Sequence, residues 1–354
     1  MSSPSNPASK AVGGRRRFPW AWGGVAITVA LLAWVLHDVD PRAVVEHIRH
    51  ARLDWLFLAI VAATLTFPIR TWRWQLMLRD SEGRPLPWMP LWHAVAIGFM
   101  ANNVLPARAG EFARAYVAAH RLPVRFPTAL ASIAVERMLD GLVMLCLLAL
   151  AVAAPSFPAG AHVAGFSLSH LAAGFGIGFG VALVVAFFVA HWPAPRLRLL
   201  GRILHALFPA RIAERLAHIA EGLIAGLTVL RQPARFAAVL AWSLALWLVN
   251  GASFWLCFKA FAIPLPFEAA LLLMALIGFG VAVPTTPGFW GVFEYATQLA
   301  LTLYNVDQTL AVSYAVAYHI TTFLPITLLG LYSLTRLHVR FDEIRAAPAP
   351  QPGA

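Results

Sequence analysis

The segment 102–114 reads NNVLPARAGEFAR and places three ionisable residues inside a strongly apolar sequence. Arg108, Glu111 and Arg114 are three residues apart, so they share one face of a helix that starts near Pro106. Guanidinium groups bind phosphate and carboxylate through paired hydrogen bonds, and a carboxylate can balance charge or bind a proton. The segment therefore predicts a binding site for a polar ligand.

Two later segments carry similar chemistry. In ASIAVERMLDG (131–141), Glu136 and Asp140 are four residues apart and share a helix face, with Arg137 nearby. In the second segment, Glu294 follows the helix-breaking run VPTTPGFWG. The candidate ligand-binding residues are Asn102, Asn103, Arg108, Glu111, Arg114, Glu136, Arg137, Asp140, Pro287, Gly288 and Glu294. The alternative is that these charges form fixed salt bridges and bind no ligand. We predict no catalytic residue, metal ligand or cofactor.

Other polar residues have simpler interpretations. Arg70 and Arg73, in FPIRTWRW, are expected to snorkel to the membrane interface beside tryptophans. His319 is expected to be a hydrogen-bonded core histidine, with a proton carrier as the alternative. Cys146 and Cys257 lie inside apolar runs, which is typical of small core residues.

The elements that must position these groups are membrane helices. The chain is 60% hydrophobic and 12% charged, whereas a soluble domain carries about 25% charged residues. Six apolar stretches approach or exceed the roughly 20 residues of a spanning helix: 20–36, 54–78, 126–154, 164–192, 235–258 and 309–334. We expect an all-α polytopic membrane protein, with one membrane domain over 20–340 between a disordered basic N-terminus, 1–19, and a disordered tail, 341–354.

Two more apolar stretches, within 88–117 and 267–300, run into helix-breaking Pro and Gly residues. We expect each to form a re-entrant, broken-helix hairpin that enters and leaves by one face. Most loop Lys and Arg residues then fall on one side, as the positive-inside rule requires. If each stretch crossed once, the arginine-rich segment 193–235 would lie outside. We therefore expect a multi-pass protein of the bacterial cytoplasmic (inner) membrane with both termini in the cytoplasm.

The basic segment 193–235 accounts for part of the net charge of +11. Apolar residues recur in it at helical spacing, and most charged residues fall on another face. This pattern is typical of an amphipathic helix on the inner leaflet, where it binds anionic lipid. A solvated cytoplasmic helical hairpin is the alternative. Neither interpretation requires nucleic acid, and we expect none as a partner.

The two predicted hairpins share an ordered series of marker residues. PLPW at 85–88 leads to IGF at 97–99, and PLPF at 264–267 leads to IGF at 277–279. Each copy is followed by a break and a glutamate. An odd number of crossings separates the copies, so the repeat is expected to be inverted. Inverted repeats with broken helices occur in many secondary transporters.

The segments GFMANNVLPARAGEFARA, SIAVERMLDG and VPTTPGFWGVFE resemble the lysylphosphatidylglycerol synthase transmembrane-region family, whose members are also described as flippase-like. The resemblance covers most of residues 50–335. It implies a membrane domain that moves, or helps to move, a lipid headgroup between leaflets. Nine of the candidate residues match the family's motif positions: Arg108, Glu111, Arg114, Glu136, Arg137, Asp140, Pro287, Gly288 and Glu294. The chain departs from the bifunctional synthases because HVRFDEIRAAPAPQPGA is too short for an aminoacyl-transferase domain, so aminoacyl transfer to lipid is not expected.

Three functions are compatible with these sequence features. The first is a lipid translocase that admits an anionic or glycolipid headgroup to a charged midplane cavity, where arginines contact phosphate. The acidic and basic residues of the predicted site nearly cancel, so strongly anionic cargo is not required. The second is a non-transporting scaffold or accessory subunit of a lipid-modifying enzyme. The third is an intramembrane enzyme on lipid-linked phosphate, which we do not expect because no nucleophile or metal motif occurs.

Overall fold

The computed structural model describes residues 19–37, 39–105, 108–158, 231–281, 287–341 and 343, together with scattered positions between 162 and 217. The regular elements of this part are helices and one short antiparallel ladder, β1 (His162–Val163) with β2 (Phe166–Ser167). The helices are α1 (Pro19–Leu36), α2 (Pro41–His50), α3 (Leu53–Met77), α4 (Trp88–Val104), α5 (Gly110–Arg121), α6 (Phe126–Ala153), α10 (Pro233–Ala260), α11 (Phe267–Gly280), α12 (Val292–Thr302) and α13 (Gln308–Leu337). The predicted all-α class is confirmed.

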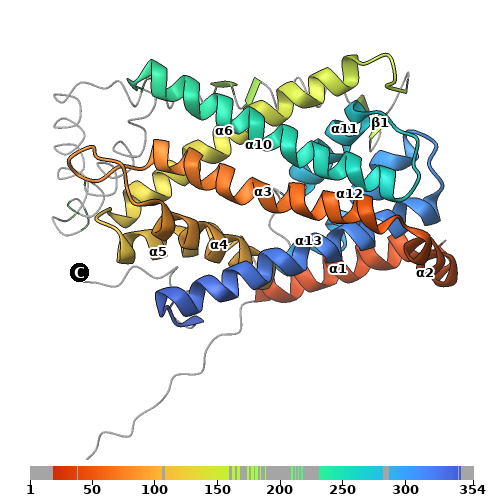
Figure 1. Cartoon of the computed structure of the whole chain (residues 1–354), viewed down its shortest axis with the longest axis horizontal. Helices are drawn as coiled ribbons and strands as arrows, with labels where there is room; N and C mark the ends of the chain where they lie inside the picture. Colours follow the sequence, from red (N-terminus) through yellow and green to blue (C-terminus); the bar gives the residue numbers. More distant parts are fainter. Residues whose placement is uncertain are drawn as a thin grey trace, which may run out of the picture.

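Among the described helices, α3, α10 and α13 are long and apolar enough to cross a membrane. They agree to within three residues with the predicted spans 54–78, 235–258 and 309–334. Helices α1 and α6 coincide with the predicted spans 20–36 and 126–154 to within one residue. Figure 1 shows α3, α6, α10 and α13 extended along the long axis of the molecule. The chain is an integral membrane protein.

Two broken helices lie between these long helices. The first broken helix consists of α4 and α5 and has its break at 105–109; the second consists of α11 and α12, with its break at 281–291. Each was predicted from Pro and Gly. In Figure 1, α4 begins and α5 ends toward the left end of the bundle, whereas α11 begins and α12 ends toward the right. Residues 106, 107 and 282–286, including the predicted breakers Pro106 and Pro284, lie outside the described part.

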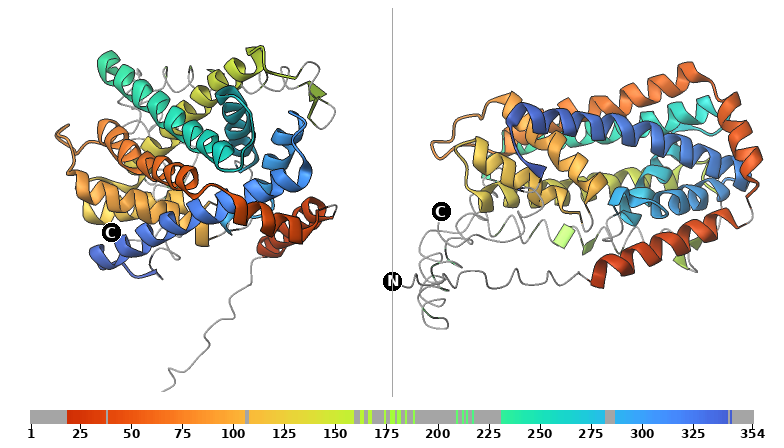
Figure 2. Two further views of the ribbon diagram at one scale, coloured as in Figure 1. Left: turned by 45° about the vertical axis from the view of Figure 1, so that its right-hand side comes forward. Right: turned by 90° about the horizontal axis from the view of Figure 1, so that it is seen from below.

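The same packing order occurs in both halves of the bundle. In the first half α3 packs on α4, α4 on α5 and α5 on α6; in the second α10 packs on α11, α11 on α12 and α12 on α13. The halves are joined by α3 on α10, α4 on α13 and α6 on α11. Helix α1 lies beside α12 at the side of the bundle (Figure 2). Each broken helix therefore packs both on the long helices of its own half and on a long helix of the other half.

Small residues allow the halves of the first broken helix to approach closely. A Cβ added to Gly110 would lie 1.9 Å from the carbonyl oxygen of Gly98, so only glycine fits at this crossing of α4 and α5. At the second break, Gly288 and Gly291 have φ angles of 70° and 86°, a left-handed conformation that favours glycine. Gly110 is thus required by the close helix crossing, and Gly288 and Gly291 are required by their backbone conformation.

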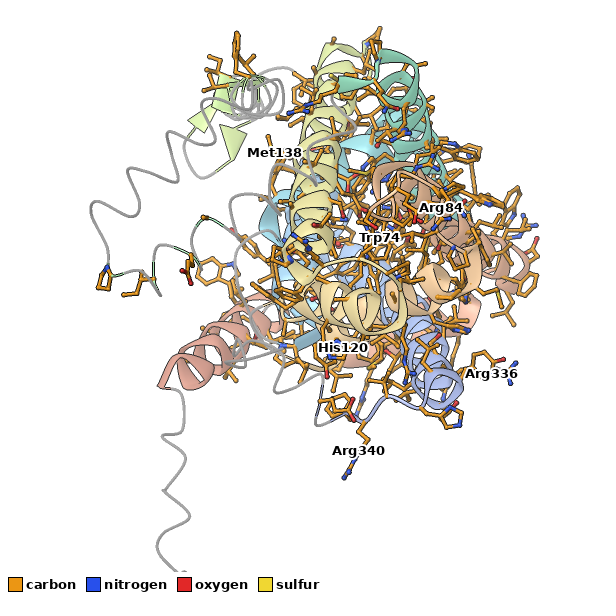
Figure 3. All side chains as sticks on the ribbon, turned by 90° about the vertical axis from the view of Figure 1, so that its left-hand side faces the viewer. Trp74, Arg84, His120, Met138, Arg336 and Arg340 are labelled. Carbon is orange, nitrogen blue, oxygen red and sulfur yellow. The ribbon has the colours of Figure 1, made fainter. Side chains whose placement is uncertain are left out.

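Basic residues are concentrated at the end of the bundle where α3 ends and α10 begins. The described ones are Arg79, Arg84, Arg121, Arg125, Arg231, Arg235, Arg336 and Arg340, whereas the opposite end carries Arg42, Arg49, Arg52 and Lys259. Figure 3 looks onto the first end, where Arg336 and Arg340 extend away from the ribbons. The predicted disordered termini, the span 164–192 and the basic segment 193–235 lie largely outside the described residues.

Candidate functional site

A buried salt bridge fixes the first broken helix to α6. Arg114 donates from Nη1 and Nη2 to the two carboxylate oxygens of Glu136, at 2.9 Å each. Both residues are buried, and the Arg114 guanidinium lies 3.8 Å from the ring centre of Trp74. The Trp74 indole N–H donates to the hydroxyl of Ser132 at 2.9 Å. A paired, stacked arginine of this kind is a rigid joint between helices.

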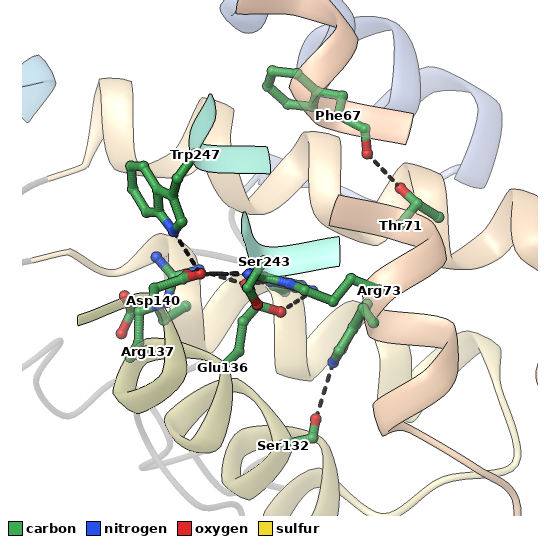
Figure 4. A network of polar contacts seen from close by, with 12 residues as sticks. Phe67, Thr71, Arg73, Ser132, Glu136, Arg137, Asp140, Ser243 and Trp247 are labelled. Atoms are coloured by element: carbon green, nitrogen blue, oxygen red, sulfur yellow. Dashed lines mark hydrogen bonds and ion pairs between the residues drawn. The ribbon is translucent and has the colours of Figure 1, made fainter. Parts of the chain in front are cut away.

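Arg73 extends this network to α3 and α10. It forms an ion pair with Asp140, lies 3.1 Å from Glu136 Oε1 and donates to the hydroxyl of Ser243 at 2.9 Å. Trp247 donates from Nε1 to Asp140 at 2.9 Å. Figure 4 shows these side chains converging from α3, α6 and α10. Because hydrocarbon cannot solvate the charges, such groups must be paired within the protein.

The expectation that Arg70 and Arg73 snorkel to the interface was wrong. Arg73 is 0% exposed and Arg70 is 6% exposed. Helix α3 continues to Met77, and Asp140 lies opposite Arg73, so the guanidinium turns into the bundle. Arg70 contacts the faces of Phe99 and Trp247 instead of a carboxylate.

The burial of Arg70 and Arg73 changes the charge balance around Glu136 and Asp140. The buried cluster contains the arginines Arg70, Arg73, Arg114 and Arg137 and the carboxylates Glu136 and Asp140. These six groups leave two positive charges in excess. Arg70 and Arg73, which the sequence interpretation placed at the interface, account for this local excess. Together with all the predicted site residues they give five arginines against four carboxylates, so the excess is confined to the surroundings of Glu136 and Asp140.

Arg137 lies at the edge of the cluster. It forms an ion pair with Glu136 and another, at 3.2 Å, with Asp140. Its side chain remains 29% exposed, whereas the side chains of Glu136 and Asp140 are almost fully enclosed. Within this cluster, Arg137 is thus the ion-paired arginine that a ligand can reach.

The two helix breaks meet at Arg108. This residue has φ of 54°, unusual for a residue with a side chain. Its Nη2 donates to Glu111 at 3.0 Å, and its Nη1 donates to the carbonyl oxygen of Val281 at 3.2 Å, at the end of α11. The side chains of Arg108 and Glu111 are 23% and 27% exposed. A left-handed residue costs about 1–3 kcal/mol, so the contact between the breaks is held against local strain.

The two predicted amides serve the backbone and a neighbouring helix. Asn102 accepts a hydrogen bond from the N–H of Gly110 at 2.8 Å and so satisfies one free donor at the start of α5. Asn103 donates to the hydroxyl of Thr327 on α13 at 3.0 Å. Asn102 is thus structural, and both amides are half-buried close to the break.

Glu294 belongs to a separate polar group in the second broken helix. Its Oε2 accepts from the N–H of Gly291 at 2.7 Å, and its Oε1 lies 2.6 Å from Nδ1 of His319. The other ring nitrogen of His319 lies 2.9 Å from the carbonyl oxygen of Gly288, in the short helix η2 (Pro287–Phe289). A carbonyl oxygen can only accept a hydrogen bond, so Nε2 donates to it. The contact between Nδ1 and Oε1 needs one further proton, which lies between these two atoms. The expected hydrogen-bonded His319 is confirmed.

The structure therefore divides the predicted site residues by role. Arg114, Glu136 and Asp140 are committed to buried salt bridges, as the alternative of fixed pairs requires. Arg108, Glu111 and Arg137 are also paired but stay partly exposed. Sequence reasoning missed four contributors to the buried network: Arg70, Arg73, Ser243 and Trp247. The three- and four-residue spacing of these pairs on α3 and α10 was the available signal.

Comparison with known proteins agrees with this architecture. The family described as "Lysylphosphatidylglycerol synthase TM region" matches residues 21–330. The chain belongs to this family. The matched residues include both broken helices and the buried network of this lysylphosphatidylglycerol synthase transmembrane region.

A curated relative is the protein named glycosyltransferase AglD from Haloferax volcanii. It is 34% identical over 117 residues, which cover 33% of this chain and 19% of the relative. The aligned region is about a fifth of that protein's length, and the activity in its name is a property of that protein.

Proposed function

We propose that the chain is a lipid translocase that moves a polar headgroup between leaflets while the acyl chains stay in the bilayer. The hydrogen bond from Arg108 to the Val281 carbonyl carries this proposal, because it joins the two helix breaks. Irregular backbone within hydrocarbon is tolerated where protein or a water-filled cavity surrounds it. Partly exposed charged side chains at that junction favour a wet, polar passage.

The proposal places the two broken helices as re-entrant hairpins in an inverted repeat. Two observations support this placement: both halves of the bundle have the same packing order, and arginines are concentrated at one end. The basic end would face the cytoplasm of a bacterial inner membrane. Halves that open to opposite faces would then give each leaflet access to the junction.

Different residues have different tasks in this proposal. The headgroup contacts Arg108, Glu111 and Arg137, which retain exposed surface. The buried pair Arg114–Glu136 keeps α5 against α6 while the headgroup passes. The proposal includes no chemical step on the lipid, and an anionic or glycolipid headgroup is the expected cargo.

The proposal is tested by reconstituting the purified full chain into liposomes that carry fluorescent phospholipids or glycolipids. A membrane-impermeant quencher then measures how fast lipid leaves the inner leaflet. We expect faster exchange than in protein-free liposomes, and a large loss of rate for Arg108→Ala. Arg84→Ala is the matched control, because Arg84 is exposed in the α3–α4 loop. Exchange no faster than in protein-free liposomes, or an unchanged rate for Arg108→Ala, contradicts the proposal.

One observation favours an accessory role as the second candidate. The curated relative is named a glycosyltransferase, and the matched region is a small part of it. A related membrane region could therefore serve a lipid-modifying enzyme as its docking partner. Under this alternative, the reconstituted chain alone does not accelerate exchange, whereas adding the partner enzyme stimulates that enzyme's turnover.

A further inference from the structure

Arg70, on α3, is a buried cation without a hydrogen-bond partner among the described residues. It is 6% exposed, and its Nε and Nη1 atoms are enclosed and unpaired. Its guanidinium carbon lies 4.8 Å from the ring centre of Phe99 and 5.6 Å from that of Trp247. Aromatic faces attract a cation, but in this arrangement they leave these N–H donors unfilled. Arginine does not lose its proton in proteins, so the charge persists.

The nearby carboxylates are already engaged by other donors. Asp140 pairs with Arg73 and Arg137 and accepts from Trp247, while Glu136 accepts two hydrogen bonds from Arg114. Arg70 is close enough to Asp140 to interact with it electrostatically but makes no ion pair with it. The cluster thus keeps its two excess positive charges.

Among the described residues, no other carboxylate forms an ion pair with a member of this cluster. Glu111 pairs with Arg108, and Glu294 contacts His319. All acidic residues except Asp38, Glu221 and Asp342 lie among the described residues, and none of the described ones pairs with Arg70. The apolar segment 164–192 contains no Asp or Glu. The missing negative charge is therefore expected to come from a ligand.

We propose that Arg70 binds the phosphate group of a ligand that enters between α3, α4 and α10. The planar guanidinium fork matches two phosphate oxygens, and the anion offsets the excess charge. Phe99 and Trp247 shield this contact from water and strengthen it. The proposal rests on the translocase function, because the lipid headgroup is the ligand that the bundle is proposed to admit. It assigns the phosphate to Arg70, a residue that the sequence pattern had placed at the interface.

The test measures binding to the purified full chain in a non-ionic detergent. The probes are dioctanoylphosphatidylglycerol, dioctanoylglycerol, which lacks phosphate, and inorganic phosphate. We expect the phospholipid to bind, the diacylglycerol to bind at least tenfold more weakly, and Arg70→Gln to weaken phospholipid binding at least tenfold. Arg84→Gln is the exposed control and should bind like the natural chain. Binding of inorganic phosphate alone identifies free phosphate as the ligand. Unchanged phospholipid binding by Arg70→Gln overturns the proposal.

A second measurement covers the case in which Arg70→Gln does not fold. A photoreactive benzoylphenylalanine in place of Phe99 leaves Arg70 intact and should cross-link the phospholipid more than the diacylglycerol; equal cross-linking overturns the proposal. Leaflet exchange separates this outcome from the proposed function. If the phospholipid binds through Arg70 but the chain does not accelerate exchange, the translocase proposal fails and the Arg70 site stands. If a folded Arg70→Gln chain exchanges lipid at the normal rate, the Arg70 site fails and the translocase proposal stands.

Discussion

Arg114 and Glu136 are joined by two parallel hydrogen bonds of 2.9 Å inside the bundle. This pair connects α5, the second half of the first broken helix, to α6. Glu136 also contacts Arg73 and Arg137. One carboxylate therefore neutralises parts of three arginines from three helices, and the arrangement of the first half of the bundle depends on it.

Removing the charge of Glu136 should destabilise the fold strongly. Glu136→Gln leaves Arg114 without an ion-pair partner and leaves Arg73 and Arg137 with Asp140 alone. Breaking one partner of a buried ion pair costs about 3–5 kcal/mol, so we expect a clearly lower Tm in detergent. Glu82→Gln, whose side chain is 65% exposed in its pair with Arg84, is the control and should change stability by less than about 1 kcal/mol. Equal Tm values for both variants would count against the network.

The close crossing of α4 and α5 predicts a second stability effect. Gly110→Ala places a methyl group against the Gly98 carbonyl, where no space exists. Overpacking of this kind costs about 1–3 kcal/mol, and we expect a lower Tm together with weaker lipid exchange. Gly174→Ala is the matched control, because nothing lies within 4 Å of its added Cβ. A Gly110→Ala chain as stable as this control would show that the helices are further apart than described.

The Glu294–His319 pair predicts a difference between two substitutions at one position. In Glu294→Gln, the amide can donate to Nδ1 of His319 and still accept from the Gly291 N–H, so stability should be preserved. Glu294→Ala leaves both groups unpaired, at about 1–3 kcal/mol each. In thermal unfolding, the natural chain and Glu294→Gln should therefore have similar Tm values, and Glu294→Ala should have a clearly lower Tm. A Glu294→Gln chain as unstable as Glu294→Ala would contradict the hydrogen-bond assignment.

The loop between α3 and α4 predicts a local dependence on pH. Hydrogen bonds from Arg84 hold the pKa of Asp80 below its ordinary value of 3.8. A carboxyl whose pKa is lowered by folding stabilises the folded loop above the ordinary value and loses this effect as the pH falls through the lowered pKa. Hydrogen exchange at the amides of Glu82 and Arg84 should therefore speed up, beyond its intrinsic pH dependence, as the solution is acidified below about pH 4.

The control for this loop is Asp80→Asn, which retains an acceptor oxygen and cannot ionise. We expect it to exchange faster than the natural chain near neutral pH and to show no comparable step on acidification. Protection in Asp80→Asn equal to that of the natural chain would mean that the charge of Asp80 does not order the turn.

Element bounds could be predicted because they depend on local sequence. The stretch 54–78 is apolar over the length of a bilayer and became α3 (Leu53–Met77). The two helix breaks follow from Pro and from glycines such as Gly288, whose backbone conformation few other residues adopt. Helix bounds and helix breaks are determined by residues that are close together in the chain, so they can be predicted from one sequence.

Partners across the bundle could not be predicted in the same way. Whether Arg73 snorkels or turns inward depends on Asp140, 67 positions away, and on Ser243 of α10. His319 meets Glu294 only because α12 and α13 pack side by side. Charge spacing identified Glu136 and Asp140 as polar sites, but their partners on α3 depend on helix packing that no local pattern describes.

The most direct test of a polar passage through the bundle is the water accessibility of the junction at Arg108. In a chain carrying Cys146→Ser and Cys257→Ala, single cysteines are introduced by Arg108→Cys and Glu111→Cys and treated in membranes with an impermeant thiol reagent. The controls are Glu82→Cys, in an exposed loop, and Ala96→Cys, which is 0% exposed. We predict labelling at 108 and 111 well above that at 96. Labelling as low as at 96, in membranes where position 82 reacts fully, would contradict the polar passage.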